Sequence, residues 1–145
     1  MQDLEERFRQ LTREMQTKPG ATEVILQNLQ AKARVALPDD YLAFLRWSNG
    51  ADGDIGDNYI QIWSAQDIAS DPYPYEDLEP NILFVAGDGG AALFGFDTRV
   101  QPMRVVLTHH LDLGDELLIP IAPSFMAFLE FLSTRSWIEF QRNYR

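Results

Sequence analysis

The stretch at residues 37–50, LPDDYLAFLRWSNG, contains the clearest local signals for secondary structure in this chain. Pro38 fixes φ at a value that a first helical turn accepts, and it lacks only a backbone donor that this turn would leave unpaired. The two aspartates that follow place negative charge where the helix dipole favours it. The Asn-Gly pair ending at Gly50 stops the helix, because glycine adopts the left-handed conformation readily. The pattern predicts a short helix of about three turns that leads into a loop rich in glycine and aspartate.

Apolar periodicity predicts two helices before this one and another near the end of the chain. Leucine, phenylalanine and methionine recur at helical spacing from Leu4 to Met15, which indicates an amphipathic helix over about residues 2–17. A Lys-Pro-Gly sequence then ends that helix, and Thr22 is the expected N-cap of the next one. Ser124 is the corresponding cap of the last helix, whose apolar stripe comprises Phe125, Phe128, Leu129 and Leu132.

Between these helices the sequence alternates short β-prone runs with turn residues. Residues 50–57 are expected to form a loop, residues 64–69 one turn of helix, and the Asp-Gly pair at 88–89 a tight hairpin turn. The expected strands are residues 59–63, 82–86, 92–97, 103–108 and 116–119. We therefore predict an α+β fold: one domain over residues 1–145, in which a mostly antiparallel twisted sheet of about four to six strands packs against N-terminal helices and a C-terminal helix.

Composition places the chain among globular proteins. Of its 145 residues, 46% are hydrophobic and 12% aromatic, which excludes a disordered chain, and there is no cysteine to form a disulfide or a thiolate. The first ten residues lack the apolar core of a secretion signal, and no apolar run reaches membrane-spanning length. We expect a cytoplasmic protein with no membrane partner.

The negative charge is concentrated in the middle of the chain. The net charge is −10, and residues 39–116 contain fifteen acidic and three basic residues, whereas each flanking segment has a slight basic excess. A concentrated negative field repels nucleic acid and steers cationic partners toward the protein. A docking surface for a basic protein would explain this distribution, and so would a solvated acidic face.

No motif in the sequence predicts catalysis, a cofactor or a metal. The AGDGGA stretch is followed by a strand rather than a helix, so it fits a hairpin turn better than a phosphate loop. The ADGDIGDN stretch fails the EF-hand pattern, because Asp57 and Trp63 stand where glycine and glutamate are required. The adjacent pair His109 and His110 would point to opposite faces of a strand. We expect no enzyme, no cofactor and no metal ligand.

Two acidic segments supply the candidate contacts to a partner. In residues 71–80, DPYPYEDLEP, tyrosines alternate with prolines among four acids, and tyrosine offers a large contact area at low entropic cost. A rigid surface loop whose tyrosines lie back on the sheet is the alternative interpretation. Together with the aspartates of the preceding glycine-rich loop, the predicted partner-binding residues are Asp52, Asp54, Asp57, Tyr73, Tyr75, Glu76, Asp77 and Glu79.

Five motifs in order resemble one known superfamily. The motifs are, in chain order, LPxDYxxFLxxSNG, the acidic glycine loop, IQIWSAQDI, ILFVAGDGGAALFGFD and IAPSFMAFLEFL. This series extends from about Gly20 to Leu132 and is similar to the SUKH superfamily. That superfamily includes the yeast Smi- and Knr-type cell-wall regulators and many bacterial toxin-immunity proteins. Many members have a glycine shortly before the Leu-Pro pair, where this chain has residues 33–36, ARVA, so its second helix is expected to run on further.

The resemblance implies a binding protein without catalytic activity. The expected function is that of a bacterial immunity protein, which uses an acidic surface to cover a cognate toxin domain that is basic and targets nucleic acid. Two alternatives remain open. One is a Smi/Knr-like regulatory scaffold that binds endogenous proteins, and the other is a protein that binds a small molecule or metal in the cleft between helices and sheet.

Overall fold

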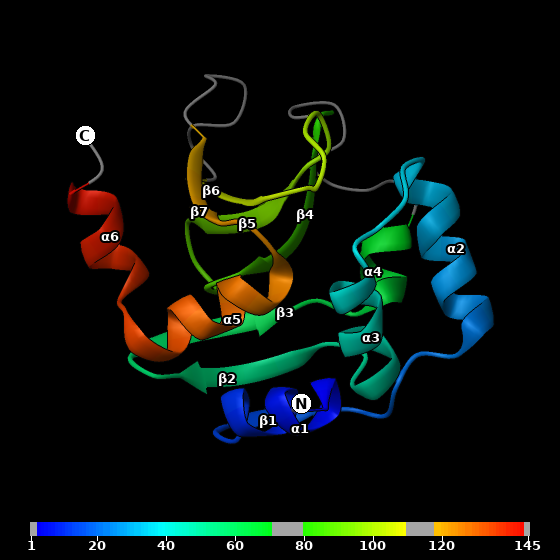
Figure 1. The fold of residues 1–145 in the computed structure, drawn as a ribbon, viewed down its shortest axis with the longest axis horizontal. Coiled ribbons are helices and arrows are strands. Elements are labelled where there is room, and N and C mark those ends of the chain that lie inside the picture. Colours follow the sequence, from blue (N-terminus) through cyan, green and yellow to red (C-terminus); the bar gives the residue numbers. More distant parts are fainter. Residues whose placement is uncertain (1–2, 71–79, 110–117, 144–145) are drawn as a thin grey trace.

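The structure, a computed structural model, describes residues 3–70, 80–109 and 118–143. One antiparallel sheet of seven strands runs through it, and the strands lie in the sheet in the same order as in the chain (Figure 1). The strands are β1 (Met15–Thr17), β2 (Ala51–Ile55), β3 (Asn58–Ile62), β4 (Ile82–Gly87), β5 (Ala92–Asp97), β6 (Val105–His109) and β7 (Ile119–Ala122).

Within the described residues, six helices accompany the sheet, near both ends of the chain and between its strands. They are α1 (Leu4–Leu11), α2 (Glu23–Ala33), α3 (Asp39–Trp47), α4 (Ala65–Ala69), α5 (Phe125–Thr134) and α6 (Trp137–Asn143). This arrangement confirms the predicted α+β class with N-terminal and C-terminal helices, while the strand count of seven exceeds the expected four to six. The predicted caps are also present, since Thr22 Oγ1 accepts from the Ile25 N–H and Ser124 Oγ from the Ala127 N–H.

The first helix is shorter than its periodicity predicts. It ends at Leu11, where the Thr12 hydroxyl donates a 2.7 Å hydrogen bond to the Phe8 carbonyl, and the chain then forms β1 instead of continuing to residue 17. Met15 pairs with Gly53 and Thr17 with Ala51. Pairing with β2 supplies hydrogen-bond partners that a last helical turn would leave missing.

The second helix also ends earlier than the resemblance implies, at Ala33. Arg34 follows it with a left-handed φ of 62°, and its N–H donates to the Gln30 carbonyl. The left-handed C-cap closes the helix even though no glycine occupies the position.

The segment expected to be a loop at residues 50–57 contains strand β2. It pairs with β1 on one side and with β3 on the other, so a run of glycine and aspartate occupies an interior position in the sheet. Gly53 permits this, because a Cβ there would lie 2.8 Å from the Cα of Met15. The last strand likewise lies a few residues later than predicted, at Ile119–Ala122 instead of residues 116–119.

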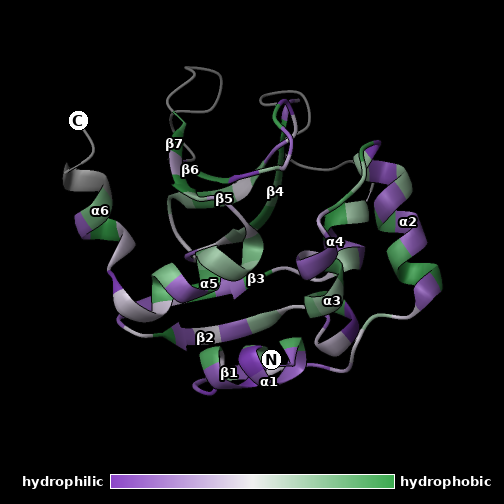
Figure 2. Cartoon of the chain, in the orientation of Figure 1, coloured by the Kyte–Doolittle hydropathy of each residue, from purple (hydrophilic) through white to green (hydrophobic). Residues whose placement is uncertain are grey.

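Aromatic side chains fill the space between the helices and the sheet. Tyr41 of α3 lies with its ring centroid 5.0 Å from that of Phe96 on β5 and 5.1 Å from that of Phe125 on α5. Phe94, the other inward aromatic of β5, lies 5.1 Å from Phe128. Figure 2 shows that hydrophobic residues predominate along β4, whereas much of β2 is hydrophilic.

The polar residues of the 37–50 stretch hold α3 to its neighbours. Asp40 Oδ2 accepts a 2.8 Å hydrogen bond from the Met126 N–H in the first turn of α5. Ser48 Oγ accepts from the Lys18 N–H and donates to the Gly50 carbonyl, and Asn49 Oδ1 accepts from the Ala65 N–H of α4. These bonds join the stretch to α5, to Lys18 and to α4, whereas α3 itself begins after Pro38 without a side-chain cap and ends at Trp47, before Gly50.

Candidate partner-binding surface

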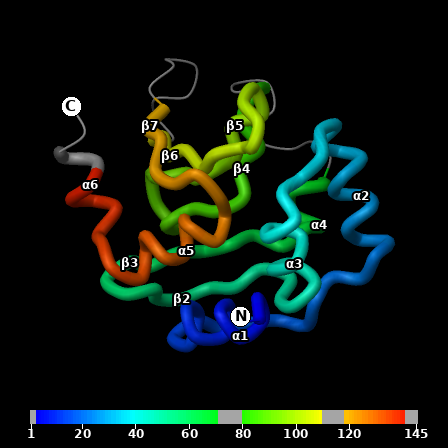
Figure 3. Tube along the Cα trace, in the orientation of Figure 1, coloured from blue at the N-terminus to red at the C-terminus, as the bar shows by residue number. Residues whose placement is uncertain are grey.

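One face of the β1–β3 part of the sheet is turned away from the core. Along the segment from β3, Asn58, Ile60 and Ile62 are buried, whereas Tyr59 is exposed and Gln61 and Trp63 are half-buried. The hairpin of β2 and β3 forms two neighbouring passes of the chain in Figure 3. We use the term open face for the outward residues here: Gln16, Lys18, Asp52, Asp54, Tyr59, Gln61 and Trp63.

The strand register places these side chains in rows. Asp54 pairs with Tyr59, and Asp52 pairs with Gln61 on one side and with Gln16 on the other. Directly opposite residues in an antiparallel pair have Cβ atoms about 5 Å apart, close enough for their side chains to touch one ligand group. Gln61 Nε2 also donates a 3.3 Å hydrogen bond to the Tyr59 hydroxyl.

The two aspartates of the open face differ in their charge environment. Asp52 Oδ2 lies 3.7 Å from Lys18 Nζ, an exposed ion pair of the kind that contributes about 0–1 kcal/mol. The Asp54 carboxylate is exposed and makes no hydrogen bond or ion pair with any residue that the structure describes. Asp54 is therefore the carboxylate on this face that is ready to meet an external cation.

A glycine turn borders the open face and leaves its aromatic rings accessible. A Cβ at Gly89 would lie 3.5 Å from the Tyr59 ring, and one at Gly87 would lie 3.4 Å from the Trp63 ring. Asp88 Oδ1 accepts from two N–H groups of the same turn, which holds its shape. With no side chain at either glycine, 46% of Tyr59 remains exposed.

The structure brings together only some of the predicted contact residues. Asp52 and Asp54 share the open face, but Asp57 lies in the β2–β3 turn, where it lines a hollow with Arg135 and Glu139 at the α5–α6 junction. The other five predicted residues lie outside the described part of the chain: Tyr73, Tyr75, Glu76, Asp77 and Glu79.

Sequence reasoning missed the three neutral members of the open face that come from β3 and the residue after it. Tyr59, Gln61 and Trp63 were not among the predicted contacts, although the strand itself was predicted. The signal was present in the period-two alternation of YIQIW, which puts the two isoleucines on one face and these three residues on the other.

Some of the mid-chain carboxylates are buried or half-buried and do not contribute to an exposed surface. Asp97 is only 1% exposed, and its carboxylate meets Arg99 Nε at 2.9 Å and Arg104 Nη2 at 3.5 Å. Burial opposes its ionisation, but hydrogen bonds from Arg99 and the positive charges of Arg99 and Arg104 together hold the pKa of Asp97 below its usual value. Asp97 and Asp40 thus act within the fold.

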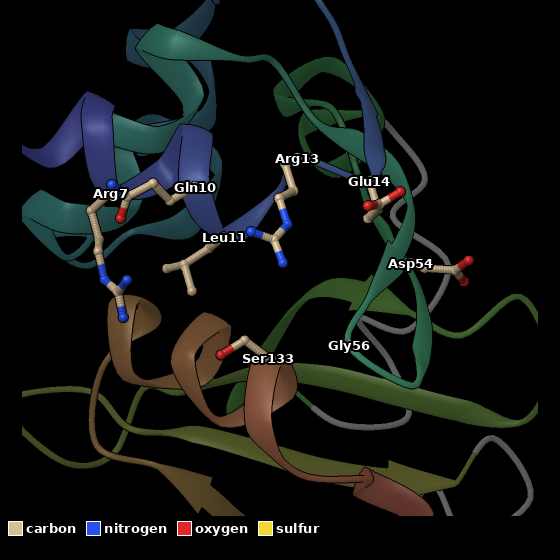
Figure 4. Close-up of a pocket in the computed structure, with 8 residues that line it drawn as sticks. All are labelled: Arg7, Gln10, Leu11, Arg13, Glu14, Asp54, Gly56 and Ser133. Atoms are coloured by element: carbon tan, nitrogen blue, oxygen red, sulfur yellow. The ribbon is translucent and has the colours of Figure 1, made fainter.

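A separate groove of about 780 Å³ lies between α1, the edge of β2 and the end of α5. Figure 4 shows the Arg13 guanidinium pointing into this groove, while the Asp54 carboxylate points away from it. Arg7, on the same wall, is paired with Glu130 at 2.9 Å. Leu11 lines the groove together with two arginines, Arg7 and Arg13, and two acidic residues, Glu14 and Asp54, so its charged residues balance.

Within residues 3–70, 80–109 and 118–143, no three histidine or acidic side chains come together as a metal site would require. The helices of the same residues include none with the length and apolar character to cross a bilayer.

Comparison with known protein families identifies the family of this fold. The sequence profile of the SMI1 / KNR4 family (SUKH-1) matches residues 20–130, which extend from the segment before α2 into α5 and include the whole β2–β3 hairpin. No curated protein matches the chain.

Proposed function

The chain belongs to the SMI1 / KNR4 family (SUKH-1), and from this premise we propose that it is a non-enzymatic protein-binding module that acts as a bacterial immunity protein. It would neutralise a cognate toxin domain in the cytoplasm by covering the surface that the toxin uses. The family fits either an immunity protein or a Smi/Knr-like module, and both functions depend on protein–protein contact.

The observation that carries the proposal is the open face. It combines an exposed, unengaged carboxylate at Asp54 with an exposed ring at Tyr59 and a half-buried ring at Trp63. Protein interfaces are enriched in tyrosine and tryptophan, and charge complementarity selects the partner and speeds association. Such a face suits a basic protein better than an anionic one.

The proposed mechanism is steric and electrostatic. A toxin that acts on nucleic acid needs a basic surface to hold phosphates, and the negative middle of this chain would attract that surface at long range. Side chains of the open face would then occupy the place of the nucleic acid.

The proposal expects a toxin domain to be encoded directly upstream of this chain's gene, and the test uses that domain. Purified protein should inhibit that domain at equimolar concentration, and Asp54→Lys should slow association and weaken its dependence on salt. Glu139→Lys, an equal charge change on the exposed side of α6, is the matched control and should leave both unchanged. Equal association rates for the wild type and Asp54→Lys would remove the open face from the mechanism.

The second candidate, a regulatory scaffold for endogenous proteins, draws on the same family membership. Gene position distinguishes the two, since an immunity protein should be encoded next to a secreted toxin. A scaffold should instead co-purify with proteins of its own host at ordinary growth.

A further inference from the structure

We propose that the open face recognises an arginine side chain of the partner protein, and that Asp54 and Tyr59 form the subsite that holds it. This inference rests on the proposed function, because it specifies the partner chemistry of the same surface. It adds a preference for arginine over lysine that negative charge alone would not produce.

The cross-strand pairing of Asp54 with Tyr59 supplies the geometry. With their Cβ atoms about 5 Å apart, a carboxylate and a phenol ring stand side by side above the sheet. A guanidinium lying flat on the ring can direct its planar N–H fork at the carboxylate and so make both contacts at once. The lysine ammonium is a compact, strongly hydrated charge that gains less from the ring.

The subsite is held in place before any ligand arrives. The Tyr59 hydroxyl accepts a hydrogen bond from Gln61 Nε2, and Gly89 lies beside the ring without covering it. Both residues of the subsite stand on interior strands of the sheet, Asp54 on β2 and Tyr59 on β3, which restricts backbone movement. A rigid, exposed ring beside a fixed carboxylate loses little entropy on binding.

Within the described residues, no arginine or lysine pairs with the Asp54 carboxylate. Arg7, Arg9, Arg46, Arg99 and Arg104 each pair with another carboxylate. Arg13, which is close in sequence to β1, points into the groove, whereas the Asp54 carboxylate points away from that groove (Figure 4). The Asp54 carboxylate is therefore available to a cation from another molecule.

The test compares two peptides of equal charge, acetyl-GRGRG-amide and acetyl-GKGKG-amide, by titration of the ¹⁵N-labelled full chain. We expect the arginine peptide to bind about threefold more tightly, with amide shifts concentrated at residues 52–54 and 59–61. Tyr59→Ala should abolish the difference between the peptides, and Tyr59→Phe, which keeps the ring, should preserve it. Asp54→Asn should weaken both peptides, whereas the control Glu139→Gln, on the exposed side of α6, should weaken neither.

Three outcomes would each overturn the arginine subsite: equal affinity for the two peptides, amide shifts confined to other parts of the chain, or no binding at about 10 mM peptide. None of these results would decide the proposed function, which depends on inhibition of the toxin domain. Conversely, a clear arginine preference without inhibition of the toxin would support the subsite and count against the immunity function.

Discussion

The side-chain oxygen of Asn58 accepts a 3.1 Å hydrogen bond from the backbone N–H of Trp137, 79 residues further along the chain. Its Nδ2 donates to the carbonyls of Leu132 and Arg135, each at 2.8 Å. Asn58 is 3% exposed, so one buried amide joins the β2–β3 hairpin to the junction of α5 and α6. The hairpin that bears the open face is anchored at its turn by this residue.

Replacing Asn58 with alanine should lower the free energy of unfolding by about 2–4 kcal/mol, because it leaves several buried backbone groups without partners. Urea denaturation followed by circular dichroism measures the change. Asn81→Ala is the control, since Asn81 is exposed and should change stability by less than about 0.5 kcal/mol. A similar loss in the two variants would contradict the anchoring role.

The Asp97 cluster predicts a specific dependence of stability on pH. Because the pKa of Asp97 is lower in the folded chain than its usual value of 3.8, its stabilising contribution is complete above that value and is lost as the pH falls through the folded pKa. Stability should therefore fall as the pH decreases below about 4.

The comparison that isolates this carboxylate is Asp97→Asn, measured by urea unfolding between pH 7 and pH 3. The variant should be less stable at pH 7 and should lose less stability on acidification than the wild type. Glu23→Gln, which removes an exposed partner of Arg46, is the control for a surface ion pair. Parallel pH profiles for wild type and Asp97→Asn would show that the cluster does not control acid stability.

Gly50→Ala should destabilise the fold by about 1–3 kcal/mol, the usual cost of a strained backbone conformation. Gly50 has φ of +95°, and a Cβ there would lie 2.7 Å from the Ile62 carbonyl oxygen. Gly90→Ala is the matched control, since its nearest neighbour would be the flexible Asp88 carboxylate at 3.4 Å. Thermal melting of both variants checks the prediction, and an unchanged melting temperature for Gly50→Ala would refute it.

Local signals in the sequence predicted the helices that have side-chain caps and the strands that have apolar alternation. The hydroxyls of Thr22 and Ser124 cap the helices where their positions indicated. Strand β2 could not be predicted in this way, because its aspartates and glycines favour turns and only pairing with two neighbours makes it a strand. The end of α1 was missed because Met15 continues the apolar periodicity of the helix, although it is buried as part of strand β1.

The candidate site, too, could be predicted only in part, because some of its features depend on tertiary contacts. That Asp52 and Asp54 share a face follows from strand geometry once β2 is known, whereas the separation of Asp57 depends on where the hairpin turns. The structural roles of Asp40 and Asp97 depend on partners brought close by tertiary folding, Met126 and Arg104 among them. Charge counts along the chain cannot distinguish such carboxylates from exposed ones.

The alternation along β3 gives the protein two independent sets of positions on one strand. Substitutions at Tyr59, Gln61 or Trp63 change what a partner meets, while Asn58, Ile60 and Ile62 keep the interior intact. Substitutions at the outward positions are therefore expected to alter the open face at small cost to folding. Alternate residues of the same short strand therefore determine the outward surface and the packing of the interior.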